Sequence, residues 1–485
     1  MKQPMEKADP LFLACVIMVS VLLFGAVEAW AAGLAGAAVI IYFNIRLHDA
    51  GFWDTGAHLT KKEGSAGDKA SIFSSWMSWE KGMFYSAAGF MSVALFSLAP
   101  LPAPAIAFFS KKEYGLIEGL PLRPPAWHSL SINGHETTTA LVRFFICMMV
   151  FSIAVRAGRD RRAPKRIFSV LAFFGFALVF FAVIQRSAWD GRIYWFRGLR
   201  NGGRPFGPFV NRNHFAGFMG MLVPPVLALA FEARRTEKTV LFAIVSAVMA
   251  AGLFYSLSRG GIISFFVSMF FFLALVRAGK PGGRRRSVYY LIFIFFSAAF
   301  LFYMFYAGIS PVVDRFEVGG LSSRTRLEVW VAALRAASDF RWFGTGLGTF
   351  REVFPLYNPG LQKTFDFAHN DYINITVETG LAGIFFLLVF FASFARGVYN
   401  YCRRQGPSYF TAGLLASVAY MLVHSFFDFN LHIPSNAITF AVVSGLATSR
   451  LHMGCENAAG GESGISSERG AMCGREAGIS GKRVH

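Results

Sequence analysis

Arginine residues crowd one short segment of the chain, between residues 186 and 213, and no lysine accompanies them. A charge that only orients a loop could be either cation, whereas arginine offers a planar fork of donors that fits phosphate and carboxylate groups. Aromatic residues such as Trp189 and Trp195 lie between the arginines and are suited to stack on sugar rings. The segment therefore predicts a site for an anionic glycan or a pyrophosphate, and its arginines are Arg186, Arg192, Arg197, Arg200, Arg204 and Arg212.

The end of this segment resembles a loop-to-helix junction. Arg204 is followed by a turn with two prolines and a glycine, and then by Asn211, Arg212 and Asn213. Asparagine is a favoured cap at a helix start, and the free backbone N–H groups there attract anions. We expect Arg204, Asn211, Arg212 and Asn213 to bind an anionic group, and the alternative is a junction with no further role.

A lone arginine, Arg259, lies in the short connection Ser258-Arg259-Gly260-Gly261 between two apolar segments. The connection is so short that Arg259 must lie at a membrane boundary. An arginine at that depth is costly and usually faces a functional cavity. The alternative is an interfacial arginine bound to lipid phosphate.

His369 is the candidate general base, because an imidazole titrates near neutral pH and stands here just ahead of a predicted helix. The alternative is an inert loop histidine. His424 and Asp428, at the end of a later apolar segment, are secondary candidates.

The segment 309–370 carries further cations and a glycine string. Arg324, Arg326 and Trp330 form an amphipathic pattern that suits anion binding, although such charges are often a solvated helix face. The string Gly344-Thr-Gly346-Leu-Gly348 follows no predicted strand, so it does not indicate a nucleotide fold.

The composition predicts a membrane protein. Of 485 residues, 54% are hydrophobic and 15% charged, whereas soluble domains carry about 25% charged residues. The apolar residues form runs long enough to cross a bilayer, so we expect an all-α polytopic fold with one transmembrane domain over residues 1–449. The net charge of +19 is explained by basic loops rather than by nucleic-acid binding. The five cysteines form no C-x-x-C pair, and we expect no metal and no cofactor.

Twelve spans are expected, near residues 11–27, 29–43, 83–100, 139–155, 167–185, 214–231, 239–257, 262–276, 288–308, 380–395, 409–424 and 434–449. With this count, the basic clusters at 156–166, 234–238, 277–286 and 396–404 share one face with both termini. The positive-inside rule makes that face cytoplasmic. The opposite face holds the loops 101–138, 186–213 and 309–370, the last a large loop before the final three spans. The tail, 450–485, lacks apolar periodicity and is predicted to be disordered.

These motifs, in this order, resemble the O-antigen ligase and polymerase superfamily of membrane proteins. The matching strings are Arg204 to Asn213, Ser258 to Gly261, Arg324 to Trp330, Gly344 to Phe350, and His369 through Glu378 to Gly383. The resemblance is clearest over residues 190–445 and is topological before them.

The resemblance implies a fold of about twelve helices in the bacterial inner membrane, with an active site facing the periplasm. It implies an inverting, metal-independent glycosyltransferase that takes a glycan from undecaprenyl pyrophosphate. The family's two arginines correspond best to Arg204 and Arg259, and its histidine to His369. Asn370 and Glu378 lie in the matching string and are secondary candidates.

The sequence leaves the acceptor open. A ligase would use a glycolipid such as the lipid A-core of lipopolysaccharide, a polymerase would use a growing polysaccharide, and a related transferase would use protein hydroxyls. Membrane lipids are expected partners, and nucleic acid is not. Two alternatives come from other functional classes. One is a transporter, in which Pro224-Pro225 marks a broken helix, and the other is a non-catalytic subunit of an assembly complex.

Overall fold

The computed structural model describes residues 8–49, 78–119, 126–198, 205–279, 323–361 and 364–476. Within these ranges, the side chains of residues 323–324 and 456–476 are not described. This part of the chain is mostly helical. Its short strands pair in two antiparallel ribbons, β1 (Leu101–Pro102) with β2 (Trp127–His128) and β3 (Arg192–Ile193) with β4 (Arg197–Gly198).

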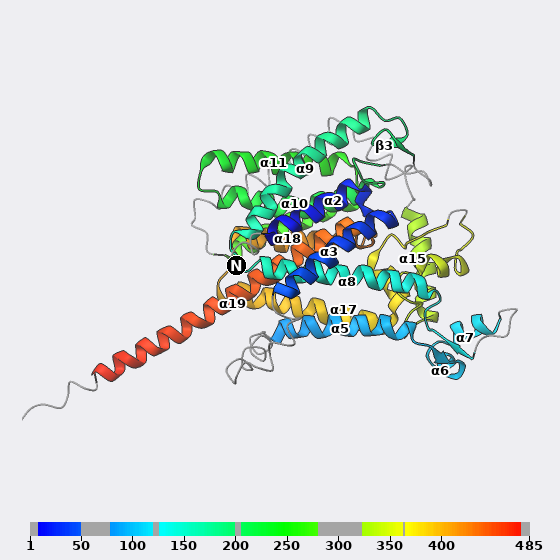
Figure 1. The fold of residues 1–485 in the computed structure, drawn as a ribbon. Helices are drawn as coiled ribbons and strands as arrows, with labels where there is room; N and C mark the ends of the chain where they lie inside the picture. Colours follow the sequence, from blue (N-terminus) through cyan, green and yellow to red (C-terminus); the bar gives the residue numbers. More distant parts are fainter. Residues whose placement is uncertain are drawn as a thin grey trace, which may run out of the picture.

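The apolar runs form long helices that lie side by side (Figure 1). Seven helices in the described ranges are long and apolar enough to cross a membrane. They are α3 (Ala29–Asp49), α8 (Gly134–Ala157), α9 (Ala163–Ser187), α10 (Arg212–Glu232), α11 (Thr236–Tyr255), α12 (Arg259–Ala278) and α17 (Asp371–Arg404). The protein is therefore a multi-pass membrane protein, as the hydropathy predicted.

Four more helices coincide with predicted spans. They are α2 (Ala8–Leu22), α5 (Ser78–Leu98), α18 (Tyr409–His424) and α19 (Pro434–Glu476). The predicted ninth span, 288–308, lies outside the described residues, so the count of twelve stays a prediction. Helix α19 continues past Arg450 to Glu476, where the sequence had predicted a disordered tail. The helical backbone of α19 therefore continues through a segment in which glycine recurs.

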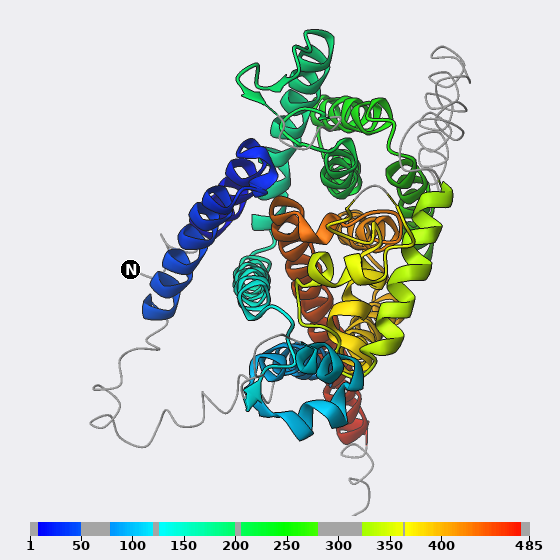
Figure 2. The ribbon, with the colours of Figure 1, turned by 90° about the vertical axis from the view of Figure 1, so that its right-hand side faces the viewer.

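Helix α10 is the centre of the bundle. Within the most apolar stretch of this helix, 94% of the residues are buried. Neighbouring helices therefore surround α10, and they are α9, α11, α12, α18 and α19. The helix continues through Pro224 and Pro225, so it is not broken where the transporter alternative would break it. Gly413 of α18 packs against this turn. The view along the helix axes shows α2 and α3, in blue, at the margin of the bundle (Figure 2).

The break lies instead in α17, at Gly380. Its φ of 60° and ψ of −161° are open to glycine alone, and they divide α17 into a short arm from Asp371 and a long span. The N–H groups of Leu381 and Ala382, just after the break, donate to the carbonyls of Arg341 and Trp342. The predicted span 380–395 thus begins where the break occurs.

The basic segments gather at one end of the bundle. Arg450 donates to the carbonyl of Arg161, Lys165 pairs with Glu232, and Arg404 donates to the carbonyl of Cys455. These contacts bring parts of two predicted basic clusters, 156–166 and 396–404, to the same helix, α19, or to the end of α10, and most of the cluster 277–286 lies outside the described residues. The face of the membrane that this end meets remains a prediction.

The smaller elements lie mainly at the opposite end, near α15 (Figure 1). They are the 3-10 turns η1 (Phe24–Ala26), η2 (Phe354–Leu356) and η3 (Asn430–His432), and the helices α6 (Ala103–Phe109), α7 (Lys111–Glu118), α15 (Ser323–Asp339) and α16 (Phe350–Val353).

Candidate active site

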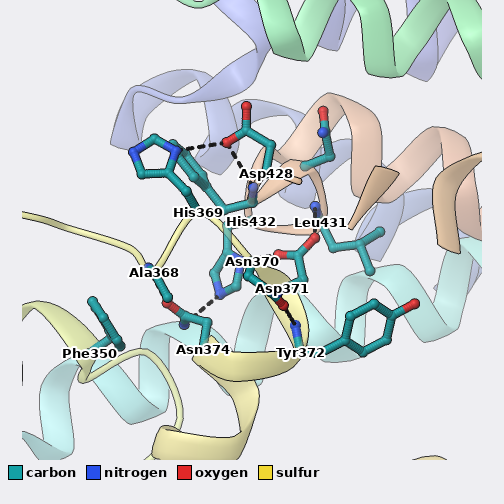
Figure 3. A network of polar contacts seen from close by, with 12 residues as sticks. Phe350, Ala368, His369, Asn370, Asp371, Tyr372, Asn374, Asp428, Leu431 and His432 are labelled. Atoms are coloured by element: carbon teal, nitrogen blue, oxygen red, sulfur yellow. Dashed lines mark hydrogen bonds and ion pairs between the residues drawn. The ribbon is translucent and has the colours of Figure 1, made fainter. Parts of the chain in front are cut away.

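His369 and Asp428 form the centre of the candidate site. Nδ1 of His369 lies 3.0 Å from Oδ1 of Asp428, although the two residues are 59 positions apart (Figure 3). His369 precedes α17, and Asp428 lies in the turn between α18 and η3. With the Nδ1 proton donated to Asp428, Nε2 of His369 carries the lone pair, and Figure 3 shows this nitrogen pointing away from the network. The pair is therefore arranged as a general base and its orienting carboxylate.

Asp428 is a buried carboxylate whose negative charge is stabilised by its neighbours. Burial opposes that charge, but the hydrogen bond from His369 and the charge of Arg326, with the imidazoles of His369 and His214, hold the pKa of Asp428 well below its usual range. Its Oδ1 also accepts from the backbone N–H of Phe429 at 2.9 Å. Asp428 therefore stays ionised at neutral pH and is able to stabilise an imidazolium.

The backbone of His369 is held in the left-handed region, with φ at 52°. Non-glycine residues seldom adopt it, and it costs roughly 1–2 kcal/mol. Its neighbours fix this conformation. The carbonyl of Ala368 accepts from Nε1 of Trp330 at 2.9 Å, and the side chain of Asn370 caps α17. The strained conformation aims the imidazole at Asp428.

Two arginines approach this pair from other helices. Arg326 of α15 donates to the carbonyl of Phe427 at 3.3 Å, beside Asp428, and Trp330 lies one turn later on the same helix. Arg259 begins α12, and its charge and that of Arg326 lie close enough to interact. Of the predicted pair, Arg204 and Arg259, only Arg259 lies within the described residues, and the second arginine beside Asp428 is Arg326.

Gly260 brings the start of α12 to the site. A Cβ atom there would lie 2.5 Å from Cβ of Phe427 and 3.3 Å from Cδ2 of His424, so only glycine allows this approach. Ser258 caps the helix by accepting from the N–H of Gly261. The start of α12 therefore offers N–H groups and a guanidinium to an anion.

The other predicted residues have varied positions. Asn211 caps α10 by accepting from the N–H of Asn213, as the sequence suggested, and Arg212 begins that helix. Arg204 lies outside the described residues, and the side chain of Arg324 is not among those described.

Glu378 is buried inside the short arm of α17 and does not contact His369. Its Oε1 accepts from Nδ2 of Asn374 at 2.8 Å and from the N–H of Phe350 at 3.3 Å. The glycine string packs against the same turn, because the N–H of Gly346 donates to the carbonyl of Glu378 and a Cβ at Gly344 would collide with that residue's backbone. These contacts give Glu378 and the glycine string a packing role.

Three residues of this region were not among the predicted site residues. His214, next to Asn213, is buried and its ring lies 5.0 Å from that of Phe429. Asp371 and His432 form a second ion pair, at 2.8 Å. The sequence does carry a signal that could have predicted this pair. Two segments, His369 to Asp371 and Asp428 to His432, each contain one histidine and one aspartate.

Two arginines of the 186–213 loop take part in packing. Arg197 pairs with Glu28 and lies 3.9 Å over the ring of Phe24, which fixes the β3–β4 hairpin on the turn between α2 and α3. Arg186 lies over the ring of Tyr255. These two cations are therefore involved in the fold itself.

Comparison with known protein families gives a match to part of the chain. Residues 244–388, from α11 to α17, match the model of a protein family described as O-antigen ligase. The matched range includes Arg259, Arg326 and His369. A search of curated proteins finds no match. Among the described residues, no group of three or more His, Cys, Asp or Glu side chains is placed to hold a metal ion.

Proposed function

We propose that this protein, which belongs to the O-antigen ligase superfamily, transfers a glycan from an undecaprenyl-pyrophosphate carrier to an acceptor hydroxyl at the periplasmic face of the inner membrane. The observation that carries the proposal is the contact of His369 with the buried carboxylate of Asp428, beside Arg259 and Arg326. This displacement requires a general base and a cationic site close to it.

The donor binds with its pyrophosphate between the two arginines. Each guanidinium offers a fork of donors to phosphate oxygens, and the start of α12 adds N–H groups and its dipole. Arg204 and Arg212 are further candidates for the same phosphates or the first sugars. The pyrophosphate linkage is already activated, so the transfer needs no ATP.

The chemical step is a direct displacement. Nε2 of His369 takes the proton of the acceptor hydroxyl, and the acceptor oxygen attacks the anomeric carbon from the side opposite the phosphate. The bond between that carbon and the phosphate oxygen breaks, and its electron pair leaves with undecaprenyl pyrophosphate. The configuration at the anomeric carbon is inverted.

Each residue acts where charge develops. Asp428 stabilises the imidazolium that His369 becomes, and Arg259 and Arg326 stabilise the charge on the leaving phosphate. Removing one fixed donor of this kind costs about 10²–10³ in rate. Loss of the general base costs about 10²–10⁴.

The test is transfer by the purified protein. Wild type, His369→Ala and Arg259→Ala are incubated with an undecaprenyl-pyrophosphate-linked glycan and with lipid A-core, oligosaccharide or protein acceptors. Lys238→Ala, in the first turn of α11, is the control for loss of a cation. Transfer by wild type and by the control, lost in the other two variants, is the expected result, and the product identifies the acceptor.

The proposal fails if a competent donor gives no transfer with any acceptor. It also fails if His369→Ala transfers glycan at the wild-type rate. Movement of a lipid or solute across liposomes without transfer would assign the arginines to a transport path.

A further inference from the structure

A second histidine–carboxylate pair lies beside the first and crosses it. Nδ1 of His432 lies 2.8 Å from Oδ1 of Asp371. His369 and Asp371 come from the start of α17, whereas Asp428 and His432 come from the turn between α18 and α19. Each segment therefore gives a histidine to one pair and an aspartate to the other (Figure 3).

Asp371 holds the segment that carries Asp428, on both sides of that residue. Its backbone N–H donates to the carbonyl of Ser425 at 2.9 Å. Its Oδ2 accepts from the backbone N–H of Leu431 at 3.3 Å. The position of Asp428, three residues from each contact, therefore depends on Asp371.

His432 holds the segment that carries His369. Its Nε2 lies 3.3 Å from Nδ2 of Asn374, and Oδ1 of the same amide accepts from the N–H of Ala368 at 3.1 Å. In its neutral form His432 donates from Nδ1 to Asp371 and accepts at Nε2 from Asn374, whereas in its protonated form it keeps only the contact with Asp371. Asn374 therefore links His432 to Ala368, the residue before His369.

Aromatic rings connect the two pairs as well. Phe367 stacks on Phe429 at 4.5 Å and lies 4.7 Å from the ring of His432. Phe429 in turn meets the ring of His369 at 4.9 Å. Ring contacts therefore run continuously from His432 through Phe367 and Phe429 to His369.

Charged groups on several elements face His432. Burial disfavours its protonation, but the hydrogen bond and charge of Asp371, with the charge of Glu378, raise its pKa above the ordinary value, and Arg143 of α8 opposes this. The Asp371–His432 contact is therefore a charge-assisted bond, stronger than a neutral one.

We propose that Asp371 and His432 are positioning residues, which set the alignment of His369 with Asp428 and so the rate of proton transfer from the acceptor. The inference rests on the glycosyl transfer proposed above. His369 needs such support because its backbone is strained. A displacement of about 1 Å in a reacting group is enough to cost roughly 10²-fold in rate.

The test compares His432→Phe, which keeps a ring against Phe367 and loses both hydrogen bonds, with His432→Gln, which keeps a donor for Asp371. We expect kcat to fall about 10–100-fold in His432→Phe, with KM for the donor within about twofold, because the arginines are untouched. His432→Gln should recover part of the rate. Rates are taken per folded protein, measured by size-exclusion chromatography, and Asp371→Asn gives an independent break of the same pair.

The chain offers a matched control pair. Nδ1 of His452 lies 3.0 Å from Oε2 of Glu80 and joins α19 to α5. His452 and His369 have the same side-chain exposure, 18%, and that of His432 is 23%, so the mutated sites are similarly buried. His452→Phe removes a similar contact far from His369 and should leave kcat unchanged.

A double-mutant cycle with Asp428→Asn separates positioning from general loss of stability. If His432 acts through the His369–Asp428 contact, His432→Phe should slow the Asp428→Asn protein less than threefold. Wild-type kcat in His432→Phe, or an equal loss in His452→Phe, would overturn this inference and leave the proposed function intact. Absence of transfer by wild type would overturn both.

Discussion

Replacing Asp428 by asparagine tests the central contact with almost no change in shape. The hydrogen bond from His369 is 3.0 Å long, and the carboxylate is about 1% exposed. A hydrogen bond to a charged group contributes about 1.5–3 kcal/mol. At about 1.4 kcal/mol for each tenfold change in rate, its loss from the transition state predicts a decrease in kcat of about 10–150-fold.

The expected loss is toward the upper end of that range. Asp428 is buried, so water does not replace the missing charge, and the asparagine amide is able to donate to His369 and favour the wrong tautomer. KM for the donor should change little, because Arg259 and Arg326 remain. The assay is steady-state transfer from the lipid-linked glycan by purified protein, with Glu80→Gln as the control for a histidine–carboxylate pair elsewhere.

The double variant decides the mechanism. If Asp428 acts only through His369, then His369→Ala combined with Asp428→Asn should be as slow as His369→Ala alone. If the double variant instead showed the product of the two single-variant decreases in kcat, the reasoning would be refuted. A wild-type kcat in Asp428→Asn would refute it as well.

Three further outcomes are expected. Arg326→Lys keeps the charge but loses the fork, so transfer should fall at least tenfold, whereas an unchanged rate would exclude a bidentate phosphate contact. Gly380→Ala should destabilise the protein by about 1–3 kcal/mol in thermal unfolding, because its φ and ψ suit only glycine, while Gly33→Ala in open helix should not. Burial raises the pKa of Glu113 to about 9. The unfolded chain ionises near its ordinary pKa of 4.5 and the folded chain only near 9, so stability should fall as the pH rises between these two values. The expected fall is at most about 3 kcal/mol between pH 5 and pH 7. In thermal melts Glu113→Gln should remove that slope, and a slope equal to that of wild type would contradict the assignment.

The sequence alone determined the features that depend on neighbouring residues in the chain, which are the helices and their caps. Apolar runs predicted the helices, and each of the eleven predicted spans within the described ranges coincides with one. Short-range capping was also predictable, because Asn211 satisfies an N–H only two residues away. Arg259 could be placed at the end of a span because the connection between its two apolar runs is only a few residues long.

The tertiary structure decided which of these residues meet. His369 contacts Asp428 across 59 positions, His432 contacts Asp371 across 61, and Arg326 contacts Phe427 across 101. A hydropathy period places a side chain on one face of its own helix, but not opposite a particular partner. That choice depends on how α10, α12, α17 and α18 pack, and on a left-handed His369 that neighbours on other segments hold in place.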